Sequence, residues 1–262
     1  MNNPVLKAKD INISFGGLKA VSDFNLEINE NELVGLIGPN GAGKTTVFNI
    51  LTGVYQPSSG EYYLNGKHIG KTSVSHLVKE GLARTFQNIK LFKNLSVLNN
   101  VLIAKNHLMK YGFLTGALRL PAFWTEEKKV KDEVMEILKI FSLEKYADIK
   151  SSNLPYGKQR KLEIARAIAT NPKILLLDEP AAGMNPTETE ELMKTIELIR
   201  KKFNISILLI EHDMKLVLGI CERIIVLDHG KIIASGEPEE VVNKQEVIEA
   251  YLGKDEDEQE GN

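Results

Sequence analysis

Cysteine is almost absent from this chain, since Cys221 is the only one among 262 residues. A single thiol excludes an intrachain disulfide and any metal site built from several cysteines, and it fits a reducing compartment. The chain also lacks an excess of either charge, because its formal net charge is only -2. This balance argues against a broad nucleic-acid-binding surface, so we expect no nucleic-acid partner.

Long apolar runs are missing as well, and the sequence predicts no membrane-spanning helix. Residues 1–7 have neither the charged n-region nor the apolar core of a signal peptide, so we expect a cytoplasmic protein whose membrane role comes through a partner. Hydrophobic residues make up 43% of the chain and charged residues 26%. That composition is typical of a globular protein with one large domain or two modest ones.

The most informative segment matches the phosphate-loop pattern G-x-x-x-x-G-K-[ST], between an apolar run at 33–37 and a helix-compatible run at 46–51. We expect its backbone N–H groups to cup the phosphates of ATP at a helix N-terminus. The Lys44 side chain would reach the outer phosphates and the Thr45 hydroxyl would ligate Mg²⁺. An ordinary glycine-rich turn is the alternative, which the flanking strand and helix disfavour. The predicted nucleotide-binding residues are Gly38, Pro39, Asn40, Gly41, Ala42, Gly43, Lys44, Thr45 and Thr46.

A second nucleotide-binding element is the acidic pair Asp178-Glu179, which follows the apolar run 174–177. Ligands collect at the carboxyl ends of parallel strands, so this pair would lie beside the phosphate loop. There Asp178 would hold Mg²⁺, and Glu179 would polarise an attacking water. An acidic pair can also cap a helix, but the buried strand before it and the phosphate loop upstream favour the nucleotide site.

Strands and helices alternate along the rest of the chain, which predicts an α/β domain with a mostly parallel central sheet. An N-terminal antiparallel β subdomain precedes a helical subdomain at about 88–165, and both belong to a single domain at 1–253. Residues 254–262 are predicted to form an acidic, disordered tail. Strands are predicted at 5–15, 21–28, 61–69 (a hairpin), 82–87, 174–177, 205–210, 224–227 and 232–234, and helices at 73–81, 126–141, 158–170 and 187–202.

Further motifs, in a fixed order, make residues 5–253 resemble the ATP-binding subunits of ABC transporters. The segment LPYGK at 154–158 resembles the family's signature LSGGQ, and RTFQ ends at Gln87 where the family has its Q-loop. His212 in IEHD matches the switch histidine, and Phe15 falls where the family stacks a ring on adenine. Alone, Gln87 and His212 could be ordinary structural or surface residues, and Phe15 could be a core residue.

The resemblance implies roles for these residues in the ATP site. Glu179, His212 and Gln87 would act in catalysis, and Gln87 would also sense Mg²⁺ or the attacking water. The signature of one subunit would bind ATP held by the phosphate loop of a second ATPase subunit, which is a copy or a paralogue. The residues expected to bind that partner's ATP are Leu154, Pro155, Tyr156, Gly157 and Lys158.

Two departures from the family pattern concern the contacts across the dimer. Pro155 replaces the serine of the signature and Lys158 its last residue, so the usual side-chain hydroxyl is missing. Gly157 and the helix that follows keep backbone N–H groups and a positive dipole end for a phosphate. Asn185 replaces an aspartate of the family, which puts the usual contact of that side chain across the dimer in doubt.

With these departures the chain resembles the branched-chain amino acid importer subgroup. Importers of urea or short amides share much of the same pattern. The resemblance implies transmembrane permease subunits as partners, an extracytoplasmic solute-binding protein indirectly, and a place on the inner face of the cell membrane. A soluble mechanical ABC ATPase and a P-loop kinase are the alternatives. The first usually has a long coiled coil or two cassettes, and the second would not explain the signature.

The segment 109–124 contains four aromatic residues between the predicted helices of the helical subdomain. They pack together as a satellite hydrophobic cluster or form a surface that faces the permease, and the sequence leaves both interpretations open. The four residues are Tyr111, Phe113, Phe123 and Trp124.

Overall fold

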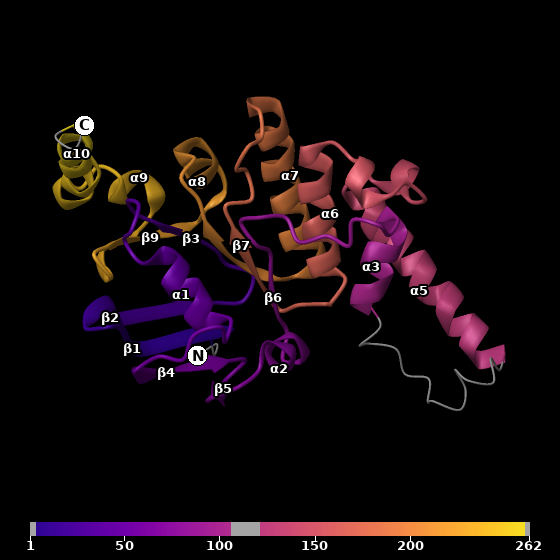
Figure 1. Cartoon of the computed structure of the whole chain (residues 1–262), viewed down its shortest axis with the longest axis horizontal. Coiled ribbons are helices and arrows are strands. Elements are labelled where there is room, and N and C mark those ends of the chain that lie inside the picture. The colour runs from indigo at the N-terminus through magenta and orange to yellow at the C-terminus, as the bar shows by residue number, and fades with distance from the viewer. Residues whose placement is uncertain (1–3, 106–120, 260–262) are drawn as a thin grey trace.

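Two β-sheets with helices packed around them make up the described part of the chain, which comprises residues 4–105 and 121–259 of the computed structural model (Figure 1). The smaller sheet is antiparallel and has the strand order β2-β1-β4-β5. Asn65 and Gly66 form the turn between β4 and β5, as the hairpin signal predicts. The N-terminal antiparallel β subdomain is therefore confirmed. Its strands are β1 (Leu6–Phe15), β2 (Leu18–Ile28), β4 (Ser59–Leu64) and β5 (Lys67–Ile69).

The larger sheet has the strand order β10-β9-β3-β8-β7-β6. Its strands pair in parallel, except that β10 pairs antiparallel with β9. Every residue of β3, β7 and β8 is buried, as expected for strands covered on both faces. The mostly parallel central sheet is therefore confirmed. Its strands are β3 (Leu33–Ile37), β6 (Leu82–Arg84), β7 (Ile174–Asp178), β8 (Ser206–Ile210), β9 (Arg223–Asp228) and β10 (Lys231–Gly236).

Two hydrophobic cores lie on opposite faces of this sheet, and consecutive residues of β7 contribute to each in turn. Leu175 and Leu177 belong to the core beneath α6, α7 and α8, whereas Ile174 and Leu176 belong to the core around α1 and the antiparallel sheet. Figure 1 shows α1 between the two sheets and the other three helices across the central sheet. Both cores fix β7, and with it the acidic residues at the end of the strand.

The strand β6 is shorter than predicted, because it ends at Arg84 rather than at Gln87. The Thr85 N–H still bonds to the Leu176 carbonyl at 2.9 Å. Beyond it, the carbonyls of Phe86 and Gln87 accept hydrogen bonds from the Arg160 side chain instead of from a neighbouring strand. Gln87 therefore lies on a loop above the sheet.

Helices occupy the predicted stretches within the described residues, and α3, α5 and α6 pack together at one end of the molecule (Figure 1). The helix α6 begins two residues before its predicted start. Two short 3₁₀ helices, Glu144–Tyr146 and Ser151–Asn153, connect α5 to α6. The α-helices are α1 (Lys44–Leu51), α2 (Val74–Lys79), α3 (Val97–Lys105), α5 (Pro121–Ile140), α6 (Tyr156–Ile168), α7 (Pro186–Phe203), α8 (Met214–Ile220), α9 (Pro238–Val241) and α10 (Gln245–Gln259).

One predicted segment differs from the structure, and another lies mostly outside its described part. The helix α10 continues to Gln259, whereas a disordered tail was expected from residue 254; Lys, Glu and Gln in this stretch are favourable in helices. Of the aromatic segment 109–124, residues 109–120 lie outside the described part. Trp124 lies in the first turn of α5 with 57% of its surface exposed. The side chains of the other three aromatic residues lie outside the described part, so both interpretations of the segment stay predictions.

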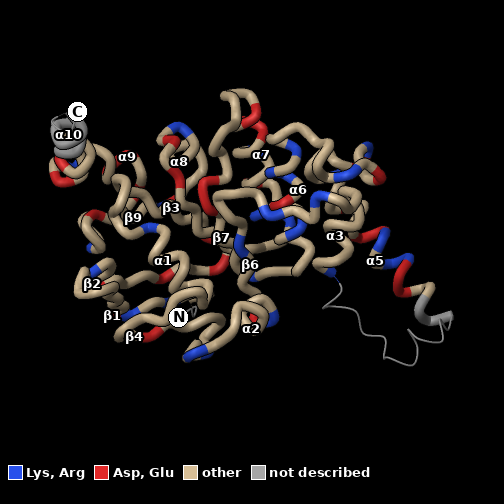
Figure 2. The backbone as a smooth tube through the Cα atoms, in the orientation of Figure 1, with Lys and Arg blue, Asp and Glu red and all other residues tan. Residues whose placement is uncertain are grey.

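The surface of the described residues carries both charges. Figure 2 shows Lys and Arg segments and Asp and Glu segments distributed over the drawn backbone, with neither sign confined to one region. Among the helices of residues 4–105 and 121–259, none is both long and apolar enough to cross a membrane.

Candidate nucleotide site

The phosphate loop connects β3 to α1 and is fixed by a close approach of the backbone to β9. Gly38 has a φ of 147°, and a Cβ on this residue would lie 2.0 Å from the Leu227 carbonyl oxygen. Only glycine fits both conditions. Lys44 is buried, with 6% of its surface exposed, and its ammonium donates to the carbonyls of Gly38 at 2.7 Å and Pro39 at 2.9 Å. These bonds hold the Lys44 ammonium at the phosphate loop, where it is expected to bind the outer phosphates of ATP.

A cavity of about 320 Å³ lies over this loop. It brings together the phosphate loop and three residues that follow different strands: Gln87 beyond β6, Glu179 after β7 and His212 after β8. These residues are separated by up to 172 positions in the chain, yet they meet at one edge of the sheet as the parallel topology requires. The lining consists of Asn40, Gly41, Ala42, Gly43, Lys44, Thr45, Thr46, Gln87, Glu179 and His212.

The Glu179 carboxylate is held from two sides. Gln87 Nε2 donates to Glu179 Oε2 at 2.7 Å, and His212 Nε2 lies 2.7 Å from Glu179 Oε1. The Glu179 side chain is 17% exposed and its backbone has a φ of 45°, a left-handed conformation that is uncommon for residues other than glycine. Such strain persists where the surroundings hold it, and it is frequent at functional sites. Two of the three predicted catalytic residues, Gln87 and His212, therefore contact the third, Glu179.

Asp178 is paired with an arginine whose role the sequence did not indicate. Arg84 Nη2 donates to Asp178 Oδ2 at 2.7 Å, and Arg84 Nη1 donates to Asn49 on α1 at 2.8 Å. Both side chains of the ion pair are nearly buried, at 10% and 6% exposure. The guanidinium thus balances the charge of the carboxylate and ties the end of β7 to α1. Arg84 is part of the RTFQ motif, but burial cannot be read from the motif.

Glu211 is a second unpredicted residue, and it joins the loops that follow β7 and β8. Its Oε1 accepts a hydrogen bond from the Ala181 N–H at 2.8 Å, and its Oε2 accepts one from the His212 N–H at 3.0 Å. Burial raises the pKa of the Glu211 carboxyl, while these backbone donors oppose that rise. The side chain therefore fixes the backbone of His212 relative to the residues after Glu179.

The signature segment lies apart from this cavity, since none of its residues lines it. The helix α6 begins at Tyr156 after Pro155, and no side chain caps its N-terminus. A Cβ on Gly157 would lie 2.6 Å from Glu188 Oε1, so any larger residue at this place would require the Glu188 carboxylate to shift. Tyr156 is 45% exposed, and the Lys158 ammonium lies over the Tyr146 ring at 5.0 Å.

Two other predicted residues lie outside the cavity as well. Phe15 is 45% exposed, and its ring meets the Tyr55 ring edge-on at a centroid distance of 5.2 Å. The core alternative for Phe15 is therefore wrong. Asn185 caps α7: its side chain accepts from the Glu188 N–H, while Glu188 accepts from the Asn185 N–H. This capping box gives Asn185 a role within its own subunit.

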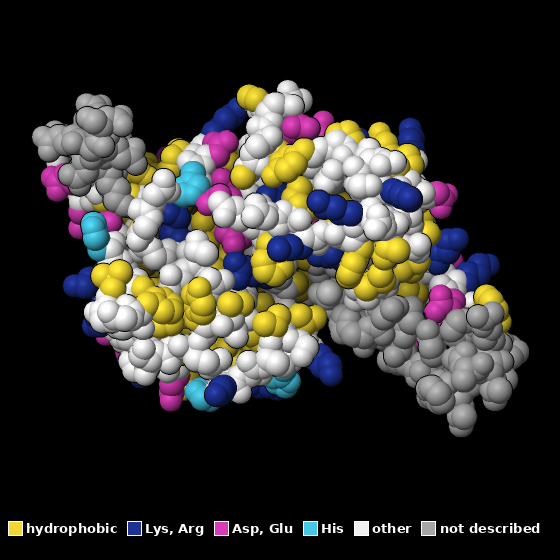
Figure 3. All heavy atoms as spheres, in the orientation of Figure 1, with side chains coloured by type: hydrophobic (Ala, Val, Ile, Leu, Met, Phe, Trp, Pro, Cys, Tyr) yellow, Lys and Arg dark blue, Asp and Glu magenta, His cyan; other side chains and the backbone are white. Residues whose placement is uncertain are grey.

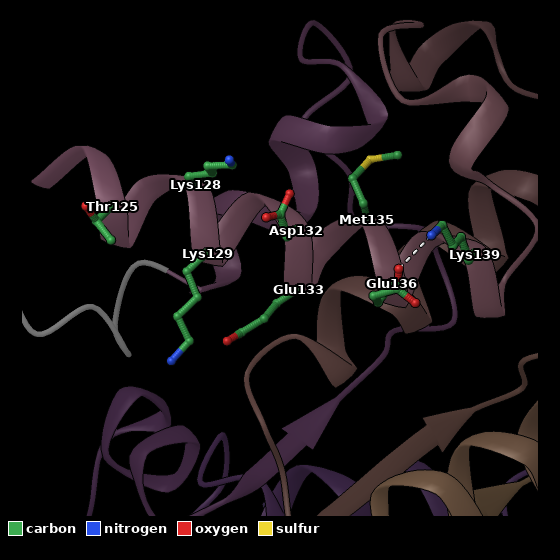
Figure 4. Close-up of a pocket in the computed structure, with 8 residues that line it drawn as sticks. All are labelled: Thr125, Lys128, Lys129, Asp132, Glu133, Met135, Glu136 and Lys139. Carbon is green, nitrogen blue, oxygen red and sulfur yellow. Dashed lines mark hydrogen bonds and ion pairs between the residues drawn. The ribbon is translucent and has the colours of Figure 1, made fainter.

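A larger hollow of about 620 Å³ lies along α5 (Figure 4). All eight of its described lining residues come from that one helix, and Lys139 pairs with Glu136 across its surface at 2.6 Å. It contains none of the residues predicted to bind a nucleotide. We therefore locate the site at the phosphate loop.

The phosphate loop, the acidic pair, the Q-loop glutamine and the separate signature helix together define an ATP-binding cassette. The chain belongs to the ABC transporter family, because the family model described as "ABC transporter" matches residues 21–182. A second model, described as "Branched-chain amino acid ATP-binding cassette transporter", matches residues 231–257. The resemblance inferred from the motifs is thus confirmed.

Individual proteins agree with the family models. The chain is 47% identical over 254 residues to the high-affinity branched-chain amino acid transport ATP-binding protein LivG of Salmonella typhimurium, covering 97% of this chain and all of that protein. The ADP conformation of MJ1267, an ATP-binding cassette of an ABC transporter, superposes with a TM-score of 0.83 at 30% identity, covering 95% of this chain and 99% of that one.

A third similar protein was solved as a dimer. The dimeric structure of MJ0796, a bacterial ABC transporter cassette, superposes with a TM-score of 0.74 at 26% identity, covering 89% of this chain and 98% of that one. The comparisons confirm the ABC ATPase cassette fold. This chain is the ATPase subunit of an ABC transporter, and it binds ATP.

Proposed function

We propose that this chain drives an importer of branched-chain or other hydrophobic amino acids. The similarity to LivG extends over the whole chain, and the branched-chain model matches its C-terminal part. The observation that carries the ATP-hydrolysing role is the contact of Gln87 and His212 with Glu179 beside the phosphate loop. An ATPase subunit does not touch the transported solute, so the solute is inferred from similarity alone.

Magnesium ATP is the proposed ligand of the cavity. Thr45 and Gln87 line the cavity, whereas Asp178 lies outside its lining, at the end of β7 and paired with Arg84. The hydroxyl, the amide and the carboxylate of these three residues all offer the oxygen ligands that Mg²⁺ prefers. When bound, the ion would neutralise phosphate charge. Lys44 would exchange its bonds to the loop carbonyls for bonds to the outer phosphates. Phe15, with Tyr55 beside it, would stack on the adenine.

The proposed chemistry is the attack of water on the γ-phosphate. The water would lie in line with the bond that breaks, which joins the γ-phosphorus to the oxygen that leaves with ADP. Glu179 would accept a proton from this water as it attacks. His212 would donate to a γ-phosphate oxygen, since its ring already lies 2.7 Å from Glu179. Gln87 would leave Glu179 when the nucleotide enters and would then report the state of the phosphates to the loop behind it.

Two subunits would close head to tail over two ATP molecules. The residues of the signature segment, Leu154 to Lys158, would then meet the ATP of the second subunit, which is a copy or a paralogue. The first turn of α6 offers backbone N–H groups without a capping side chain, and those groups suit a phosphate. Pro155 supplies no hydroxyl, so the contact would be made by the backbone.

The membrane partner would dock on the helical subdomain, at about 88–165 of the domain 1–253. Figure 3 shows hydrophobic side chains on the surface over the β-rich part and near α3. Phe86 and Phe92 are 38% and 48% exposed close to Gln87 in the chain. We place the chain on the inner face of the membrane against transmembrane permease subunits, with an extracytoplasmic solute-binding protein acting indirectly.

The test is purification of the native complex followed by uptake into sealed vesicles. Labelled leucine should enter in an ATP-dependent way when the matching binding protein is present. Uptake of urea but not of leucine would replace the proposed solute while retaining the motor. Purification without any membrane subunit would favour a soluble ABC ATPase and contradict transport.

The exposed tryptophan of α5 allows a test of the docking surface. We expect Trp124→Ala to reduce transport in the assembled complex while the ATPase rate of the isolated subunit stays the same. The melting temperature should fall by less than about 2–4 °C, which corresponds to 1 kcal/mol in a chain of this size. The control is Leu198→Ala, because Leu198 is also an exposed apolar residue but lies on α7. Normal transport with a lower melting temperature would leave Trp124 as a packing residue.

A further inference from the structure

A buried ion pair connects the signature helix to the catalytic loops. Arg160 and Glu163 lie one turn apart on α6, and their side chains are 0% and 2% exposed. Arg160 Nη1 lies 2.9 Å from Glu163 Oε2. Removing two charges from water costs several kcal/mol per ion, and attraction within the pair often does not offset that cost. The pair therefore needs an explanation other than the stability of α6.

The remaining hydrogen bonds of the pair point away from its own helix. Arg160 Nη1 donates to the Phe86 carbonyl at 2.6 Å, and Nη2 donates to the Gln87 carbonyl at 2.7 Å and to the Glu179 carbonyl at 3.4 Å. Glu163 Oε1 accepts from the Lys90 N–H at 2.9 Å. A planar guanidinium can contact several carbonyls at once in a fixed geometry, which a lysine ammonium cannot reproduce.

These contacts reach the backbone behind two proposed catalytic side chains. Gln87 and Glu179 are joined to each other at 2.7 Å in the cavity, and Arg160 contacts both of their carbonyls from the opposite side. Glu179 is also the residue with the left-handed backbone, at a φ of 45°. Arg160 does not line the cavity. It is therefore a positioning residue that acts through the backbone of Gln87 and Glu179.

We propose that the Arg160–Glu163 pair couples the two ATP sites of the dimer. This inference rests on the proposed head-to-tail arrangement, in which the first turn of α6 meets the partner's ATP. Arg160 is four residues after Tyr156, or about 6 Å along the helix axis. A displacement of α6 by the partner's phosphate would move the carbonyls of Gln87 and Glu179 in this subunit. Occupation of one site would thereby set the alignment of catalytic groups in the other.

The test is the variant Arg160→Lys in the full-length chain, which keeps the charge for Glu163 and removes the fork. We expect ATP affinity by calorimetry to be unchanged and kcat to fall by about tenfold to a hundredfold, as displacement by ~1 Å can cause. The Hill coefficient for ATP should fall from above 1 in the wild type to 1, because the sites no longer communicate.

The matched control is Arg200→Lys. Arg200 on α7 is also nearly buried, pairs with Glu222 at 2.6 Å and donates to the Asn31 carbonyl at 3.1 Å. Neither of these partners belongs to the loops that carry Gln87 and Glu179. We expect this variant to lose some stability and to keep both the wild-type kcat and the wild-type Hill coefficient.

A second variant keeps the inference testable if Arg160→Lys does not fold. Arg160→Met with Glu163→Gln removes both charges, a change that buried pairs often tolerate, and it should give the same loss of kcat and cooperativity. A folded variant of either kind with wild-type kcat and Hill coefficient would overturn the coupling role. A wild-type protein that never dimerises with ATP would instead contradict the proposed head-to-tail arrangement.

Discussion

The N-termini of α1 and α6 differ from those of α7 and α8 in how their backbone N–H groups are satisfied. Asn185 and Asp213 cap α7 and α8 with side-chain oxygens. No side chain caps α1 or α6, and neither helix has an acidic residue in its first turn. Both ends therefore keep donors and a positive dipole end for an anion.

The two uncapped ends differ in their surroundings. The start of α1 lies in the cavity with a buried Lys44 and with Glu179 and His212 across from it. The start of α6 carries an exposed Tyr156 and lies outside that cavity. In the proposed head-to-tail dimer, the first end would hold ATP from its own subunit, whereas the second would meet the phosphate of an ATP held by the partner. One chain would thus supply two complementary halves, one to each of the two ATP sites.

Removal of the proposed catalytic carboxylate should have the largest effect, because it should stop hydrolysis while leaving ATP binding and dimer formation intact. We expect Glu179→Gln to lower kcat by about a hundredfold to ten-thousandfold, because the proposed general base is lost, while ATP binding remains. The variant should also accumulate as an ATP-bound dimer, measured by sizing chromatography with light scattering. Glu80→Gln, a carboxylate in an ion pair with Lys67, is the control. Near-normal turnover in Glu179→Gln would refute the assignment.

Loss of the phosphate-loop lysine should act at the start of α1, the end that would bind ATP within one subunit. We expect Lys44→Ala to weaken ATP binding by about 10-fold to 150-fold, which corresponds to 1.5–3 kcal/mol for hydrogen bonds to a charged group. Calorimetry on the isolated subunit measures it. Lys67→Ala on the antiparallel sheet should bind ATP as the wild type does. Equal affinities for the Lys44 variant and the wild type would contradict the role of this lysine.

A methyl group at the start of α6 should affect only the end that needs a partner. We expect Gly157→Ala to weaken the ATP-dependent dimer of the Glu179→Gln protein by about tenfold, or 1.4 kcal/mol, because its Cβ would collide with the Glu188 carboxylate. ATP affinity of the monomer should not change. Gly219→Ala, on α8, is the control, since its Cβ likewise meets the end of a movable side chain, that of Met193, but away from the signature. An unweakened dimer in Gly157→Ala would remove the signature from the interface.

The smallest effect should come from a helix end that is capped. We expect Asn185→Ala to cost about 1 kcal/mol of folding stability, or 2–4 °C in melting temperature, as loss of an N-cap usually does. ATP affinity and kcat should remain at the wild-type values. A large fall in kcat with an unchanged melting temperature would give Asn185 a catalytic or interface role in place of the cap.

The sequence predicted those parts of the site that depend on short-range pattern. The glycines and Lys44 of the phosphate loop follow an apolar strand, and Glu179 follows another, so the parallel sheet brings them to one edge. The motifs did not reveal Arg84 or Arg160, because a charged residue gives no local signal that it will be buried. The end of β6 was missed for the same reason, since Arg160 takes the carbonyls that a strand would have used.

Consecutive residues of β7 pack into opposite cores. The number of residues in this strand is therefore more constrained than the identity of each aliphatic side chain. Leu175 and Leu176 face opposite cores, so replacement of either by another aliphatic residue changes only local packing. Deletion of a single residue would exchange the two environments for the whole strand and would turn Asp178 to the other face of the sheet. We therefore expect insertions and deletions among related chains to be confined to the connections between strands, where they shift no side chain from one core to the other.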